Sequence, residues 1–411
     1  MVYAFTEELE EWLRRPQSVK TAQAAQALVP EASKVPVRPF SIGLRSATLW
    51  VIALSVVVAA GLYSLRHKTQ FRAHAGQPET VALPGRHLPT PEAQDLYLKG
   101  RLAWNQRTPE SLNQAVDYFT QAIVHDPNFA AAYVGLADCY NLLREFSVMP
   151  PSEAYPRALA AARKSVELDP DSSEAHISLA FALFWGNVDV VASGREFKRA
   201  IALDPRNTRA HHWYATYLVQ ICRYPEALAE IERARQLDPS STAISADKGK
   251  ILIMSGQTEE GIALLKQVEA ADPSFSEVHR YLSDADLDQG DIRAYFDEAA
   301  TANRLSHNAD AEFVLAQQRK GFAAGGIHGL QEATLRAHRK LYDEGHATDF
   351  TLAVDYSILN DKADSLHYLE VAYQKHDPMM AAILGYTDLR NVREEPAFKT
   401  LALKIGLPPV P

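Results

Sequence analysis

The chain has 411 residues, of which 47% are hydrophobic and 23% charged, a composition that excludes a disordered or fibrous protein. This length suits two or three compact domains or one long repeat array. The formal charge of −9 excludes a nucleic-acid binder with one broad basic surface, because phosphate neutralisation needs clustered Lys and Arg. The cysteines, Cys139 and Cys222, lack the paired spacing of a zinc site and are too few for a disulfide framework, so we expect buried thiols.

The first 15 residues predict a short strand and then a helix from Glu7 to Arg15, which ends at Pro16. This pair resembles the closing part of an excisionase-type winged-helix domain, whose recognition helix would enter the major groove of DNA and is absent from this segment. Residues 1–15 are therefore either the remnant of such a head or an unrelated amphipathic segment. Residues 16–45 contain four prolines and no sustained apolar period, which is typical of a linker.

A run of twenty residues without a charge, Ser46 to Leu65, follows the linker. As a helix it would be about 30 Å long, which matches the hydrocarbon core of a bilayer. Trp50 and Tyr63 lie near its two ends, where aromatic side chains meet the membrane surface. The run predicts one transmembrane helix rather than a buried core helix or a cleaved signal peptide. Basic residues flank it on both sides, so charge alone does not fix its orientation. A second, proline-rich linker covers residues 66–91.

The dipeptide Asp-Pro then recurs at intervals of 34 to 43 residues, and a later copy begins at Asp377. Before Pro127, Pro205 and Pro239, small residues stand five and twelve positions ahead of the proline and a large residue stands eight ahead, as at Ala122, Ala115 and Phe119. A period near 34 is the tetratricopeptide spacing, in which each repeat is a hairpin of two helices. The recurring prolines that mark the period are Pro127, Pro170, Pro205, Pro239 and Pro273.

The pattern predicts an all-α fold, a tetratricopeptide α-solenoid in which up to eight helical hairpins from residues 92–375 form a right-handed superhelix. Residues 376–411 are expected to cap its C-terminal end. A longer loop, with Pro150, Pro151 and Pro156, is expected where the interval is 43 residues. Asp247 and Lys248 stand where the fifth repeat should carry a large and a small apolar residue.

Several stretches resemble the repeat region of bacterial membrane-tethered transcriptional regulators. They are the segment 96–109, the segment 133–138, Ala210-His211-His212-Trp213-Tyr214, and the tail with Leu389-Arg390-Asn391 and Pro396-Ala397-Phe398. In that family a winged-helix head precedes one membrane span and a repeat domain. The resemblance implies a single-pass protein of the bacterial inner membrane, with its N-terminus in the cytoplasm, its repeats in the periplasm, and a role in signal transduction or transcription regulation.

Motifs that carry chemistry are missing from the sequence: there is no phosphate loop, no His-Glu-x-x-His and no Gly-x-Ser-x-Gly. The glycines Gly321, Gly325, Gly326 and Gly329 are interpreted as a turn between helices. Adjacent residues on a helix point about 100° apart, so His211 and His212 are interpreted as packing or groove residues rather than a metal pair. We therefore expect no enzyme activity, no cofactor and no metal.

The expected function is binding, because a solenoid offers a long concave surface lined by the first helix of each hairpin. Family geometry implies that a protein or peptide ligand contacts that face. The alternative is a membrane-tethered scaffold with no genetic output, and DNA would be a partner only if a head is encoded upstream of Met1. The predicted groove residues are Trp104, Asp138, Asn141, Phe181, Trp185, His212, Thr216 and Gln220. Phe181 and Trp185 either line this groove or pack between neighbouring hairpins.

Overall fold

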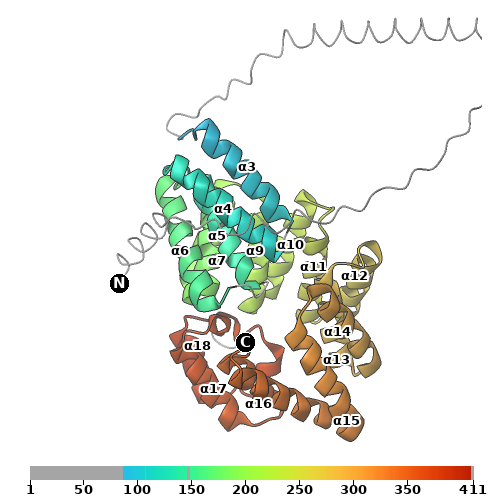
Figure 1. Ribbon diagram of the computed structural model, residues 1–411. Coiled ribbons are helices and arrows are strands. Elements are labelled where there is room, and N and C mark those ends of the chain that lie inside the picture. The colour runs from blue at the N-terminus through green and yellow to red at the C-terminus, as the bar shows by residue number, and fades with distance from the viewer. Residues whose placement is uncertain (1–86, 107, 146–148, 409–411) are drawn as a thin grey trace, which may run out of the picture. The chain divides into compact units, whose positions relative to one another are not determined.

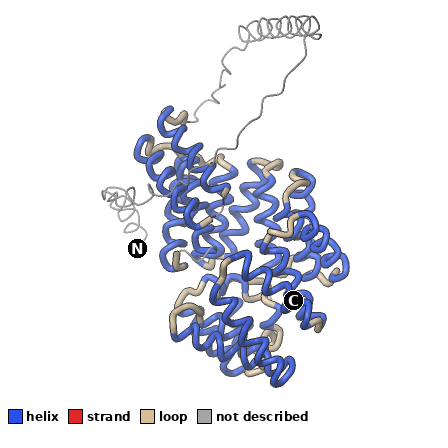
Figure 2. Tube along the Cα trace, turned by 45° about the vertical axis from the view of Figure 1, so that its right-hand side comes forward, coloured by secondary structure: helices blue, strands red, loops and turns tan. Residues whose placement is uncertain are grey.

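The computed structural model describes residues 87–106, 108–145 and 149–408, and from Pro89 onward these residues belong to one compact unit. Within these ranges the chain forms helices, turns and loops without a strand (Figure 2). This confirms the predicted all-helical class for the described residues. The predicted head, the first linker and the apolar run 46–65 lie outside them. In the described ranges, no helix is both long enough and apolar enough to cross a bilayer.

The helices follow one another with short connections (Figure 1). Their bounds are α3 Pro91–Asn105, α4 Pro109–His125, α5 Ala130–Glu145, α6 Pro151–Leu168, α7 Ser173–Asn187, α8 Val190–Leu203, α9 Thr208–Gln220, α10 Tyr224–Leu237, α11 Thr242–Met254, α12 Thr258–Ala271, α13 Ser276–Gln289, α14 Ile292–Ser306, α15 Ala309–Asp343, α16 Asp349–Ile358, α17 Lys362–Gln374, the 3-10 helices η1 Pro378–Ala382 and η2 Thr387–Leu389, and α18 Pro396–Lys404.

Consecutive helices pair as hairpins, from α3 with α4 to α13 with α14, and again α16 with α17. The first helices of neighbouring hairpins also contact one another, in the succession α3, α5, α7, α9, α11 and α13. Figure 1 shows these hairpins side by side. Each hairpin therefore buries its apolar face against its neighbours, as expected of a repeat array.

The Asp-Pro dipeptides end the second helices for a local reason. The Asp is the C-cap residue, with an extended backbone, and the following proline cannot continue the helix. The Asp carboxylate then accepts a hydrogen bond from the backbone N–H two residues later, as from Asn128 to Asp126 at 3.2 Å and from Arg206 to Asp204 at 2.9 Å. This Asx-turn turns the chain toward the next hairpin. The Asp377 carboxylate accepts the equivalent hydrogen bond from the Met379 backbone N–H, but Asp377 is the N-cap residue of η1 rather than the C-cap of a helix.

Small residues permit close packing inside the hairpins. The ring of Phe119, which is fully buried, lies between Gly100 of α3 and Gly135 of α5. A Cβ atom added at Gly135 would lie 2.5 Å from the ring, and one added at Gly100 would lie 2.7 Å from it. The large residue eight positions before the proline thus fills the space that glycines on two neighbouring first helices leave open.

The prediction of a turn at the glycine cluster is confirmed. Inside α15, Gly325 and Gly326 have non-helical backbone angles, and Gly326 has a φ of 62°, which favours glycine. The two halves of α15 then approach so closely that a Cβ on Gly321 would meet the carbonyl oxygen of Gly329 at 2.2 Å. The halves of α15 therefore form a hairpin of their own.

Two details of the predicted repeats were wrong. Pro156 lies inside α6, which begins at Pro151, rather than in a loop, so the longer interval is partly extra helix. In the fifth repeat the positions equivalent to Leu136 and Ala137 are Lys248 and Gly249, one residue later than predicted. Lys248 reaches sideways to Glu232, with 2.9 Å between Nζ and Oε2, while a Cβ on Gly249 would meet the side chain of Leu265 at 2.7 Å.

The C-terminal segment packs against the middle of the repeat array. η1 contacts α7, and the residues from Met380 to Leu384 are almost fully buried. The Cys222 thiol at the end of α9 donates a hydrogen bond to the Leu384 carbonyl at 3.2 Å. One hydrophobic core therefore joins α7–α11 with α16–α18.

Candidate binding face

The predicted groove residues lie on α3, α5, α7 and α9, and we call their side of the first helices, continued along α11 and α13, the first-helix face. It carries a group of half-buried rings, Phe181 and Trp185 from α7 and Trp213 from α9. The Phe181 ring centroid lies 4.8 Å from that of Trp213 and 6.3 Å from that of Trp185. We call these three residues the aromatic cluster. Trp213 was not among the predicted residues.

A buried ion pair lies beside the aromatic cluster. Asp138 is fully buried, accepts a hydrogen bond from the Ser178 hydroxyl at 2.5 Å, and pairs with Arg209. Arg209 also pairs with Glu174, and its guanidinium carbon lies 4.9 Å from the ring centroid of Trp213. Burial tends to lower the pKa of Arg209, but the two carboxylates outweigh it and hold that pKa above its usual value. This network links three successive hairpins.

A second polar network continues across α9, α11 and α13. His212 Nε2 lies 2.7 Å from Asp247 Oδ2, and the Tyr281 hydroxyl donates to Asp247 Oδ1 at 2.7 Å. Burial opposes ionisation of Asp247, but these two hydrogen bonds keep its pKa below the usual value. Lys250 and Arg280 lie over the Tyr281 ring, at 4.9 and 4.5 Å from its centroid. The face is thus aromatic at α7 and α9 and charged toward α13.

The remaining predicted residues differ in their accessibility. Trp104 and Asn141 are buried, and no hydrogen bond is present at the Asn141 amide among the described residues. The Thr216 hydroxyl donates to the Trp213 carbonyl at 2.9 Å, within its own helix. Gln220 lies against Gly385 of the C-terminal segment, where an added Cβ would be 2.4 Å from its Oε1. The structure therefore leaves Phe181, Trp185, His212, Thr216 and Gln220 half-buried, and it buries Trp104, Asp138 and Asn141.

A separate cavity of about 440 Å³ lies at the far end of the array, lined by α13, α15, α16, η2 and the residues after η2. Its carboxylates are Asp288, Asp355 and Asp388. Burial raises the pKa of Asp355, although His338 Nδ1 lies 2.7 Å from its Oδ2, and burial with the nearby Asp288 raises the pKa of Asp388. Sequence reasoning missed this cavity because its walls come from elements far apart in the chain.

Three histidines make equivalent bridges at the joints between hairpins. In each, Nε2 lies 2.9 to 3.0 Å from the carbonyl oxygen of the preceding Asp-Pro proline. Nδ1 lies 2.5 to 2.7 Å from a glutamate on the second helix. The pairs are His176 with Glu196, His211 with Glu230, and His279 with Glu298. His211 and His212 therefore contact different partners, as the helical geometry predicts.

Comparisons with known proteins agree with this architecture. Two models of the tetratricopeptide repeat match residues 192–242 and 223–285. The transcriptional regulator HilA of Salmonella typhimurium is 26% identical over 217 residues, which cover 48% of this chain and 39% of HilA. The type IV pilus assembly protein PilF of Pseudomonas aeruginosa is 35% identical over 74 residues, which cover 18% of this chain and 29% of PilF.

Among solved structures, the human IFIT1 dimer with m7Gppp-AAAA has a similar fold. Its TM-score is 0.51 at 17% identity, over 77% of this chain and 72% of IFIT1. The matched region spans less than half the length of HilA and of PilF. Together with the helical hairpins and their Asp-Pro turns, these matches show that the chain is an all-helical tetratricopeptide repeat protein with homology to HilA and PilF.

Proposed function

We propose that this protein binds an extended peptide segment of a partner protein on the first-helix face, with the aromatic cluster as the anchor. The observation that carries the proposal is the group of Phe181, Trp185 and Trp213, three large rings from two adjacent hairpins that are only half-buried. Aromatic side chains dominate the binding energy of protein interfaces because they bury a large area at a small cost in conformational entropy. The charged residues toward α13 would set the orientation of the peptide.

Selection from a random peptide display library, with the purified full-length chain as bait, tests this proposal. Phe181→Ala removes a central ring and should lower the affinity of the chain for the selected peptides by about tenfold, as expected of an interface hot spot. Val191→Ala is the matched control, because Val191 is an exposed apolar residue on α8. Peptides that bind both variants equally well would place the binding site elsewhere.

A membrane-anchored regulator is the wider role that we propose. The uncharged run from Ser46 to Leu65 would anchor the chain in the bacterial inner membrane. The N-terminus would lie in the cytoplasm and the repeats in the periplasm, where they would sense a partner. The similarity to HilA, a transcriptional regulator, supports a regulatory output. DNA would be a partner only if a head is encoded upstream of Met1.

Fractionation and labelling test the anchor and its orientation. The chain should stay with membranes after alkaline carbonate washing, and recovery in the soluble fraction would reject the anchor. A cysteine introduced at Gln77, in the second linker, should react in intact cells with a reagent that passes only the outer membrane. Reaction only after lysis would reverse the proposed orientation.

Assembly of other proteins is the alternative, and the similarity to the pilus assembly protein PilF supports it. In this case the same face would hold subunits together without a genetic output. The DNA upstream of Met1 separates the two roles. An in-frame helix-turn-helix favours the regulator, whereas a nearby stop codon favours the scaffold.

A further inference from the structure

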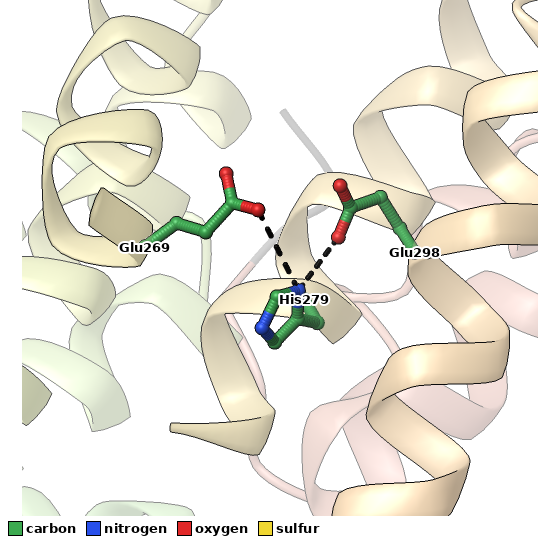
Figure 3. Close-up of side chains that lie close together, drawn as sticks. All are labelled: Glu269, His279 and Glu298. Atoms are coloured by element: carbon green, nitrogen blue, oxygen red, sulfur yellow. Dashed lines mark hydrogen bonds and ion pairs between the residues drawn. The ribbon is translucent and has the colours of Figure 1, made fainter. Parts of the chain in front are cut away.

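The third histidine bridge differs from the other two by one additional carboxylate. His279 Nδ1 lies 2.7 Å from Glu298 Oε2 and 3.9 Å from Glu269 Oε1. Figure 3 shows the two carboxylates directed at the same ring nitrogen from different helices. One ligand atom from each residue lies within 4.8 Å of the others. The three residues come from α12, α13 and α14.

The repeat register shows that Glu269 is the exception. It precedes its bridging histidine by ten positions, and the same position holds Val166 before His176 and Ile201 before His211. The other two bridges therefore combine one ring with one carboxylate. Glu269 is not needed to hold the ring, because the contacts to Pro273 and Glu298 repeat those of the other bridges.

The backbone fixes which nitrogen of His279 is available. Nε2 lies 3.0 Å from the Pro273 carbonyl oxygen, which can only accept a hydrogen bond, so Nε2 carries the hydrogen. In the neutral ring the lone pair on Nδ1 then faces the two carboxylates. A histidine that donates its other N–H to a backbone carbonyl is the usual arrangement for a metal ligand, because it sets both the tautomer and the ring orientation.

We propose that Glu269, His279 and Glu298 form a binding site for a divalent transition-metal ion of the zinc class. Tetrahedral bonds of 2.0 to 2.2 Å separate ligand atoms by about 3.3 to 3.6 Å. The distances from His279 Nδ1 to Glu298 Oε2 and to Glu269 Oε1, 2.7 and 3.9 Å, lie on either side of that range. Small rotations of the two glutamate side chains therefore bring their oxygen atoms to metal-binding distances. A water molecule takes the fourth position, since His279 is buried while the glutamates remain partly exposed.

The ligand set selects among metals. One imidazole nitrogen with two carboxylates suits Zn²⁺ or a related transition ion. Ca²⁺ requires six to eight oxygen ligands, and Mg²⁺ binds reluctantly to nitrogen and keeps several waters, so both are expected to bind weakly. The bound ion joins the hairpin α11–α12 to the hairpin α13–α14.

Calorimetric titration of the full-length chain with Zn²⁺, after removal of metals with a chelator, tests the site. Glu269→Gln removes one ligand but leaves the His279 bridge in place, and it should weaken Zn²⁺ binding by about tenfold or more. Glu260→Gln is the matched control, because Glu260 is an exposed residue on the same helix. It should bind Zn²⁺ as the unaltered chain does.

Two further measurements complete the test. Co²⁺ should give the visible absorption of a four-coordinate ion in the unaltered chain and lose it in Glu269→Gln, and excess Mg²⁺ should not displace it. Circular dichroism of both variants checks that they are folded. Equal Zn²⁺ affinities for the two variants, or no saturable binding at one ion per chain, would overturn the proposal.

Discussion

Replacing Arg209 by Met tests whether the buried ion pair with Asp138 organises the first-helix face. The methionine keeps most of the aliphatic length of the arginine but removes its charge. Asp138 is fully buried and would retain only the Ser178 hydroxyl as a hydrogen-bond donor. Glu174 is nearly half exposed, so water replaces its lost partner at little cost.

The expected loss of stability follows from these contacts. An uncompensated buried charge costs about 3 to 5 kcal/mol. The lost cation–π contact with Trp213 adds about 0.5 to 1 kcal/mol. In the double variant Asp138→Asn, Arg209→Met no charge remains buried, so most of the loss should be recovered. The coupling between the two positions should therefore be about 3 kcal/mol.

Urea unfolding of the full-length chain and of the three variants, followed by circular dichroism, measures this cycle. Repeat arrays can lose two-state behaviour, so the slopes of the transitions must agree before free energies are compared. A loss below about 1 kcal/mol for Arg209→Met, or additive effects of the two substitutions, would refute the reasoning.

Three further predictions concern other parts of the fold. The hydrogen bond to Glu230 raises the pKa of the His211 ring. Burial tends to lower the pKa of the His176 ring, but its hydrogen bonds to Glu196 and Pro170 outweigh burial and raise that pKa. Their stabilisation is complete below the unfolded value of about 6.5 and is lost as the pH rises through the raised folded pKa. Urea midpoints of a His176→Gln, His211→Gln variant should thus fall less from about pH 6 to about pH 8 than those of the unaltered chain, and parallel profiles would contradict this. Gly135→Ala should lower stability by about 1 to 2 kcal/mol, since overpacking against the Phe119 ring exceeds the gain in helix propensity. In thermal unfolding, adding Phe119→Leu should restore part of the stability that Gly135→Ala loses. An unchanged midpoint for Gly135→Ala would count against the close packing. Gly385→Ala should speed proteolytic cleavage of the C-terminal segment, because the new Cβ would lie 2.9 Å from an α9 backbone atom, and unchanged cleavage would argue against that contact.

The sequence predicts the repeat architecture well because its signals are local. The Asp-Pro turn depends on a carboxylate and an N–H two residues apart, and the small and large positions lie within one helix. Family geometry likewise predicts Phe181 and Trp185 on the concave face, and both are half-buried in the structure. The same spacing could not show that Asp138 is buried, because its enclosure depends on Arg209 from two hairpins later.

Features that depend on distant residues escaped prediction. The contact of Gln220 with Gly385 joins segments without a shared repeat register, so no periodicity could indicate it. The network at Asp247 was missed because the fifth repeat was read one residue out of register. In the structure its carboxylate has two partners, His212 and Tyr281, each on the first helix of a neighbouring hairpin.

The packing of the C-terminal segment also affects how the chain is made. The hydrogen bond from Cys222 to Leu384 joins residues that are 162 positions apart. At about 5 to 20 residues per second, a ribosome needs about 8 to 30 seconds to add that length of chain. In the folded protein, Met380 to Leu384 pack against an apolar surface of α7 and α9. During that interval these residues have not yet been made, so they do not shield this surface. The nascent chain therefore presents a chaperone-binding surface that disappears only after the segment from Met380 to Leu384 has been made.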